Sequence, residues 1–214
     1  MKKFFFILFF FVLHNFSDLN ALDVKEVNYY KDKKAWLVND NNLPIVDIKF
    51  AFKAGSGIDF KGKKGTANLT ASLLDEGAGN YSAKEFKKVL ADNSITLNFS
   101  VSHDNFYIDL YTLKENLDLS FQLLDLALTK PIFKLEEVNR IKGNIKLILE
   151  ESYKDPDEIT SRIFREVLFE DHPYKYDTLG VLEDIDKIEK QDLELFLKTN
   201  LRLDNFYVAA SGDI

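Results

Sequence analysis

The sequence contains no cysteine and only three histidines, and both shortages restrict its chemistry. Without cysteine, the 214-residue chain can form no disulfide framework, no thiolate metal site and no cysteine nucleophile. Its 28 basic residues are outnumbered by 35 acidic ones, and no basic block is long enough to bind a phosphate backbone. After residue 21, no apolar run approaches the roughly 20 residues of a transmembrane helix. These absences argue against a nucleic-acid partner and against a membrane span in the rest of the chain.

The first 21 residues have the pattern of a secretory signal peptide. Two lysines follow the initial methionine, Phe4–Leu13 is an unbroken apolar run, and the segment closes on the small residue Ala21. Ten helical residues span about 15 Å, half of the roughly 30 Å hydrocarbon core of a bilayer, so the run is too short for a stable anchor. We therefore expect cleavage after Ala21 and a periplasmic or secreted protein. An uncleaved anchor and a buried strand are the alternatives.

Hydrophobic periodicity after Ala21 mixes strands with helices. Alternating apolar residues predict strands over 24–31, 35–38, 45–54, 95–102, 106–111 and 206–210. Helical spacing predicts helices over 66–76, 83–90, 117–128, 138–149, 159–168 and 193–198. The second of these helices follows a capping box formed by Ser82 and Glu85. The order of elements predicts an α+β fold, with a mixed, largely antiparallel sheet covered by helices on one face, rather than a βαβ nucleotide-binding fold.

A few side chains are candidates for chemistry, and each also has an ordinary structural explanation. His103 in a hairpin turn is expected to be exposed, and His172 before a proline is expected to make local hydrogen bonds. Asp75 and Glu76 form a carboxylate pair at a helix end, where a solvated surface is expected. Ile148 belongs to the apolar stripe of a long helix and is therefore expected on its buried face.

One string is long enough to carry a family resemblance, residues 65–79, which read GTANLTASLLDEGAG and are followed by Ser82–Phe86. Shorter matches follow in order at 123–125, 130–133, 148–151, 155–156, 172–174, 179–180, 192–196 and 210–213. Together they resemble the N-terminal homology domain of the insulinase and pitrilysin family of zinc peptidases over residues 35–214. The resemblance implies a single peptidase-like domain over 22–214 that forms the first half of a two-domain subunit.

The stretch that matches the family's catalytic motif departs from it. Active members carry His-x-x-Glu-His there, with two imidazoles as zinc ligands and the glutamate as general base. Asn68, Ala71 and Ser72 occupy these places and supply an amide, a methyl group and a hydroxyl instead. Glu151 matches the position of the remaining family ligand, but one carboxylate does not hold zinc. We expect no catalytic residues, no metal site and no cofactor in this chain.

The resemblance implies a non-catalytic subunit rather than an enzyme. Residues 73–79 and the serine-rich hairpin over 96–102 look like those of non-catalytic family members. The expected partners are an active zinc peptidase paralogue in the periplasm, which alone would carry zinc, and a peptide or unfolded protein as substrate. The residues that would bind this substrate are not identified. Two alternatives stay open, an autonomous exported module that binds peptides or proteins, and a zinc metalloendopeptidase with a divergent site.

Overall fold

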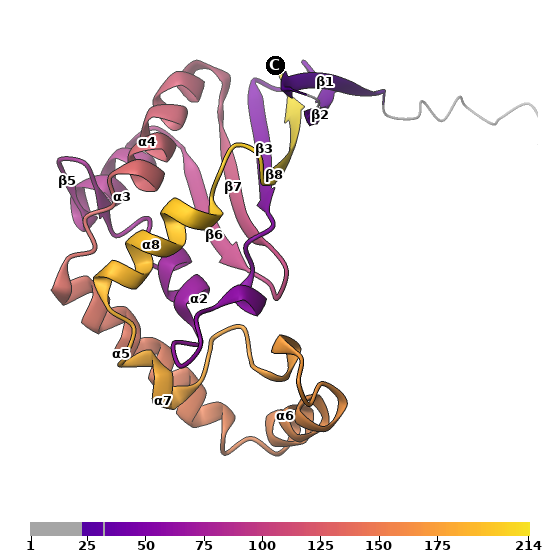
Figure 1. The fold of residues 1–214 in the computed structure, drawn as a ribbon. Coiled ribbons are helices and arrows are strands. Elements are labelled where there is room, and N and C mark those ends of the chain that lie inside the picture. Colours follow the sequence, from indigo (N-terminus) through magenta and orange to yellow (C-terminus); the bar gives the residue numbers. More distant parts are fainter. Residues whose placement is uncertain (1–22, 32) are drawn as a thin grey trace, which may run out of the picture.

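A computed structural model describes residues 23–31 and 33–214, so the expected signal peptide lies outside the described residues. Figure 1 shows a six-stranded sheet with helices packed against it. Its strands are β1 (Val24–Tyr30), β2 (Lys33–Asn39), β3 (Ile45–Phe52), β6 (Thr96–Val101), β7 (Phe106–Leu113) and β8 (Phe206–Gly212). Their order across the sheet is β1-β2-β8-β3-β7-β6, and only β2 and β8 run parallel. This sheet confirms the predicted fold class.

All but one of the helices in the described residues lie where the sequence pattern predicts one, and the exception is the short helix over 182–185. The helices are α2 (Thr66–Ala71), α3 (Ala83–Asp92), α4 (Leu117–Thr129), α5 (Leu135–Ser152), α6 (Pro156–Leu168), α7 (Leu182–Ile185) and α8 (Lys190–Asn200). Short 3₁₀ turns lie at η1 (Ser56–Ile58), η2 (Lys114–Asn116) and η3 (Pro173–Lys175), and a two-stranded ribbon joins β4 (Gly77–Ala78) to β5 (Tyr81–Ser82). The capping box that precedes α3 forms as predicted. Among the residues that the structure describes, no helix is both long and apolar enough to cross a membrane.

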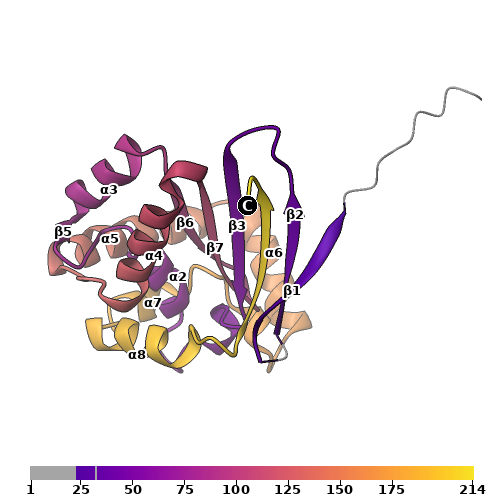
Figure 2. The same cartoon turned by 90° about the horizontal axis from the view of Figure 1, so that it is seen from above.

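One face of the sheet is buried and the other is largely polar. On β3, Val46, Ile48 and Phe52 are at most 6 % exposed and belong to the hydrophobic core. Figure 2 shows α3, α4 and α8 on the same side of the sheet. The alternate residues point the other way, and Lys49 of β3 forms a 2.7 Å ion pair with Asp109 of β7 there. The expectation of a sheet covered on one face is confirmed.

The helix predicted over 66–76 ends early, at Ala71. The backbone N–H groups of Leu73, Leu74 and Glu76 donate to carbonyls three residues back instead of four, so the chain tightens into successive turns. Leu73 and Leu74 are still fully buried. The leucine spacing that predicted a longer helix is therefore satisfied equally well by these turns.

Glu76 and Ile148 contradict the burial that their sequence patterns predicted. Glu76 is 6 % exposed rather than solvated, and its carboxylate forms ion pairs of 2.6 Å with Lys87 and 2.7 Å with Arg140. Ile148 is 52 % exposed, although Ile145 and Leu149 of the same helix are at most 4 % exposed, so the buried stripe of α5 is narrower than the sequence pattern predicted. Glu76 is buried because α3 and α5 bring two cations to it, and a local pattern does not contain that information.

Candidate functional site

A buried carboxylate fixes the start of α2, the helix that carries the positions of the family's catalytic motif. Asp59 accepts hydrogen bonds from the backbone N–H groups of Gly65 (2.7 Å) and Ala67 (2.8 Å). Burial raises the pKa of Asp59 to about 6, although these hydrogen bonds act to lower it. Gly65 has a φ of 104°, and a Cβ there would lie 2.7 Å from the Leu179 carbonyl oxygen. The beginning of α2 is therefore held both by hydrogen bonds and by close packing.

The three motif positions lie on two sides of α2. Asn68 and Ser72 are half-buried and four residues apart, so their side chains leave the helix in the same direction. Ala71 is 4 % exposed and belongs to the core. None of the three side chains can act as a general base near neutral pH, and an amide and a hydroxyl are poor ligands for zinc.

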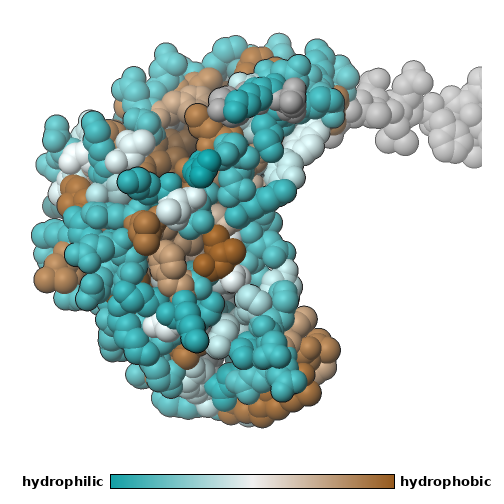
Figure 3. Space-filling view, in the orientation of Figure 1, coloured by the Kyte–Doolittle hydropathy of each residue, from teal (hydrophilic) through white to brown (hydrophobic). Residues whose placement is uncertain are grey.

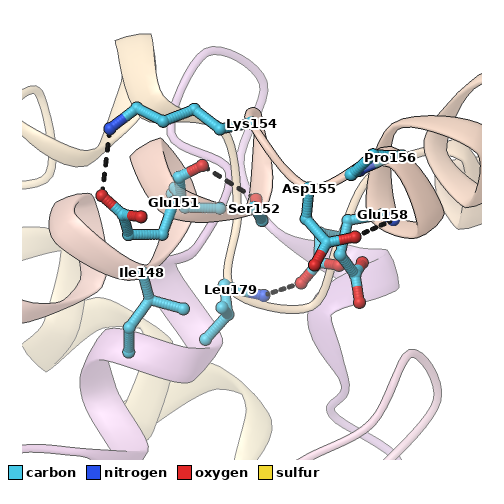
Figure 4. Close-up of a pocket in the computed structure, with 10 residues that line it drawn as sticks. Ile148, Glu151, Ser152, Lys154, Asp155, Pro156, Glu158 and Leu179 are labelled. Atoms are coloured by element: carbon cyan, nitrogen blue, oxygen red, sulfur yellow. Dashed lines mark hydrogen bonds and ion pairs between the residues drawn. The ribbon is translucent and has the colours of Figure 1, made fainter.

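Glu151 lies on the last turn of α5, and its side chain is 64 % exposed. Figure 4 shows its carboxylate directed to Lys154, with which it forms a 3.0 Å ion pair. Both residues line an open cleft of about 650 Å³ between the end of α5, the start of α6 and the segment around Leu179. None of the described residues that line this cleft comes from α2. The structure therefore does not place Glu151 in one cavity with Asn68, Ala71 and Ser72.

Two of the other three carboxylates that line this cleft have structural partners. Asp155 caps α6 by accepting hydrogen bonds from the backbone N–H groups of Asp157 (2.8 Å) and Glu158 (3.3 Å). Asp177 accepts a 2.9 Å hydrogen bond from the Leu179 backbone N–H. These contacts explain the positions of Asp155 and Asp177 without a ligand.

The two histidines of the described chain are engaged locally. The His103 ring Nε2 lies 3.0 Å from the Tyr176 carbonyl oxygen, and the residue is half-buried, so the expectation of an exposed side chain was wrong. The His172 ring Nδ1 accepts a 3.3 Å hydrogen bond from the Tyr174 backbone N–H, as its position before a proline predicted. Both imidazoles pack against the Tyr174 ring, with centroid distances of 4.8 and 4.5 Å.

These residues do not fit a catalytic zinc ion. Such sites usually take three protein ligands from His, Glu, Asp and Cys. Within residues 23–31 and 33–214, no group of three or more such side chains is arranged to hold a metal. The two motif positions that would supply imidazoles carry Asn68 and Ser72, and a lysine neutralises Glu151. No reaction step through a metal follows from this arrangement.

An open strand edge lies next to α2 and was not identified in the sequence. β6 is the last strand of the sheet and pairs on one side only, with β7. Its sequence, TLNFSV, contains no charge and no proline, the usual features that protect an edge from further pairing. α2 packs against β6. The sheet order that makes β6 an edge depends on pairings between distant strands, so no local signal could have revealed it.

Comparisons with known proteins agree with this fold. The family model described as Insulinase (Peptidase family M16) matches residues 34–181, which is more than half of the chain. The chain therefore belongs to the insulinase family, peptidase family M16.

Individual relatives show how much of a family member the chain represents. It is similar to the non-peptidase homolog YmxG of Helicobacter pylori, with 29 % identity over all of this chain and 49 % of that protein. It is also similar to the zinc protease PqqE of the same organism, with 25 % identity over 82 % of this chain and 40 % of that protein. Among solved structures, a peptidase M16 inactive domain from Pseudomonas fluorescens shares the fold with a TM-score of 0.85, at 23 % identity over 90 % of this chain and 47 % of that one. The chain thus spans about half the length of YmxG.

Proposed function

We propose that this chain is a catalytically inactive member of the insulinase family that supplies binding surface to an active zinc peptidase. The observation that carries the proposal is the set of side chains on α2, where Asn68, Ala71 and Ser72 replace two imidazole ligands and the base. The pairing of Glu151 with Lys154 supports it, because the remaining ligand position is engaged by a cation of the same chain.

The relatives support the same interpretation. The similar proteins include one named as a non-peptidase homolog and one described as an inactive domain. Helicobacter pylori contains both such a homolog and a zinc protease that match this chain. A non-catalytic and a catalytic family member therefore occur in one organism, as a pair of subunits would require.

The substrate surface in this proposal is the free edge of β6. An extended peptide can add to an exposed strand through backbone hydrogen bonds, and its alternate side chains then contact the faces of the sheet. Such a peptide would lie beside α2, where the catalytic motif of an active member would be. This chain would hold the peptide, and cleavage would take place on the partner.

The cellular setting of the proposal is the periplasm or the exterior. It rests on the basic start, the apolar run and Ala21 in the first 21 residues. The chain matches about half the length of YmxG, which supports a role as the first half of a two-domain subunit.

The test combines the chain with the paralogue of the same organism that carries His-x-x-Glu-His. We expect a mixed species with the summed mass in size-exclusion chromatography with light scattering, zinc only in the paralogue, and peptide cleavage only when that protein is present. Glu151→Gln in this chain should leave cleavage unchanged. The Ser102 backbone N–H donates to the Asn105 carbonyl within the β6–β7 hairpin, so the odd-numbered residues of β6 turn their N–H groups to the free edge. Val101→Pro removes one of these donors and should weaken peptide binding, and Val101→Ala is the matched control.

Each alternative predicts a different result. Stoichiometric zinc in the isolated chain, with cleavage that Glu151→Gln abolishes, would establish a metalloendopeptidase with a divergent site. An unchanged mass on mixing, together with binding of peptide by the isolated chain, would establish an autonomous binding module.

A further inference from the structure

The helix α6 exposes an apolar face to solvent. Ile163, Phe164, Val167 and Leu168 are between 52 % and 78 % exposed, and α6 contains no buried residue. Residues four apart lie above one another on a helix, so the pairs 163/167 and 164/168 form one continuous stripe. In Figure 3 this apolar patch covers the lower right rim of the molecule, where Figure 1 places α6.

The opposite face of α6, which is turned to the protein, is charged. The Arg162 guanidinium lies over the ring of Tyr153, the residue that follows α5, 4.4 Å from its centroid. Arg165 forms a 3.4 Å ion pair with Asp177, and its buried Nε has no hydrogen-bond partner in the structure. A cavity of about 140 Å³ remains between these side chains. The charged face inside and the apolar face outside reverse the usual amphipathic arrangement of a surface helix.

Such a face requires a partner surface, because an exposed apolar stripe at the rim of a soluble domain marks an interaction site. Its border restricts what that partner can be. Asp157, Glu166, Glu170 and Asp171 are exposed around the stripe. Of these, Glu166 approaches a cation of the same helix, Arg162, at 3.9 Å. The border is therefore predominantly acidic.

The acidic border disfavours two simple occupants. Helices that bind at a bilayer surface carry lysine and arginine beside their apolar face, and a carboxylate border repels anionic headgroups. A second copy docked through the same face would bring the two acidic borders together, and like charges across an interface oppose association. A protein surface with an apolar centre and a basic border would match both the apolar stripe and the carboxylates around it.

We propose that the outward face of α6 docks a partner protein whose contact surface has an apolar centre bordered by lysine and arginine. Ile163, Phe164, Val167 and Leu168 fill the centre, as in other complexes where one helix face lies in an apolar groove. This interaction goes beyond the proposed function, since it does not depend on the partner being a zinc peptidase or on peptide binding at β6.

The first test uses the chain of residues 22–214 and two synthetic helical peptides with the same leucine stripe, one bordered by lysine and one by glutamate. Fluorescence anisotropy of the labelled peptides measures binding at low and moderate salt. We expect binding of the lysine-bordered peptide, weakened by salt, and at least about tenfold weaker binding of the glutamate-bordered one.

Matched variants assign this binding to α6. The double substitution Phe164→Ser/Val167→Ser should weaken it at least about tenfold, because central apolar anchors carry most of an interface's affinity. The control Leu135→Ser removes a side chain that is 72 % exposed on α5 and should leave binding unchanged. Both variants should keep the circular dichroism spectrum, since neither alters the core. Glu170→Lys/Asp171→Lys should reduce the preference for the lysine-bordered peptide.

Three results would overturn the proposal. The first is that the lysine-bordered peptide does not bind, or that it binds equally tightly to the Phe164→Ser/Val167→Ser variant. The second is a dimer in analytical ultracentrifugation that the same double variant dissociates, which would identify a second copy as the occupant. The third is equally tight binding to phosphatidylglycerol vesicles that depends on these two residues, which would identify a lipid surface.

Discussion

The contribution of the buried Asp59 carboxyl to the free energy of unfolding should decrease as pH rises. Its pKa is about 6 in the folded protein and 3.8 in the unfolded chain, so the folded state holds the proton more tightly. The contribution of Asp59 is therefore complete below pH 3.8 and is lost as pH rises through about 6. The difference between the two pKa values corresponds to about 3 kcal/mol, of which about 2 kcal/mol is lost between pH 4.5 and 7.

The assay is urea unfolding of the parent and of Asp59→Asn at several pH values between 4.5 and 7. The asparagine cannot titrate, so the difference in free energy of unfolding between the two proteins isolates Asp59 from the other carboxylates. The parent should lose about 2 kcal/mol relative to the variant over this range. Asp59→Asn should also place an NH₂ group against the amides of α2 and cost about 1–2 kcal/mol at pH 7. Parallel pH profiles for the two proteins would refute the reasoning.

Three further predictions concern stability and are measured by the same unfolding assay. The two cations beside Glu76 outweigh its burial and lower its pKa. Glu76→Gln should therefore lower the free energy of unfolding by about 1–3 kcal/mol at pH 7, and by less as the pH falls below 4.5. The exposed control Glu136→Gln should change this free energy little. Ala71→Glu restores the general base of the family motif but places a carboxylate at a core position, so it should lower the free energy of unfolding by about 3 kcal/mol or more. A loss below about 1 kcal/mol would mean that the position opens to solvent. Phe86→Ala should cost about 3–5 kcal/mol and the exposed Phe164→Ala less than about 0.5 kcal/mol; equal losses would contradict the assigned burial.

Features that depend on neighbours in the sequence were predictable. The hairpin of β6 and β7 follows from apolar residues at every second position, and the start of α3 follows from the hydrogen bonds between Ser82 and Glu85. The assignment of Asn68, Ala71, Ser72 and Glu151 to motif positions comes from the family resemblance and stays a prediction. In each case the information lies within a short stretch of chain or a fixed motif.

Features that depend on distant contacts could not be predicted from the sequence. Glu76 is buried because Arg140, 64 positions later, reaches its carboxylate. The edge position of β6 depends on the pairing of β3 with β7 and β8. For α6, periodicity predicted the helix correctly but could not reveal which face meets the protein. The charged inner face becomes evident only when Tyr153 and Asp177 are seen beside it.

The position of β8 has a consequence for how the chain reaches its folded state. This strand, residues 206–212, lies between β2 and β3 and connects β1 and β2 to the remainder of the sheet. During synthesis from the N-terminus, the first two strands therefore have no place in the sheet until residues 206–212 have been made. The sheet therefore stays incomplete while the preceding residues are made. A delay of this kind would suit the export proposed above, because a polypeptide that crosses a secretion channel has to stay unfolded until it has passed.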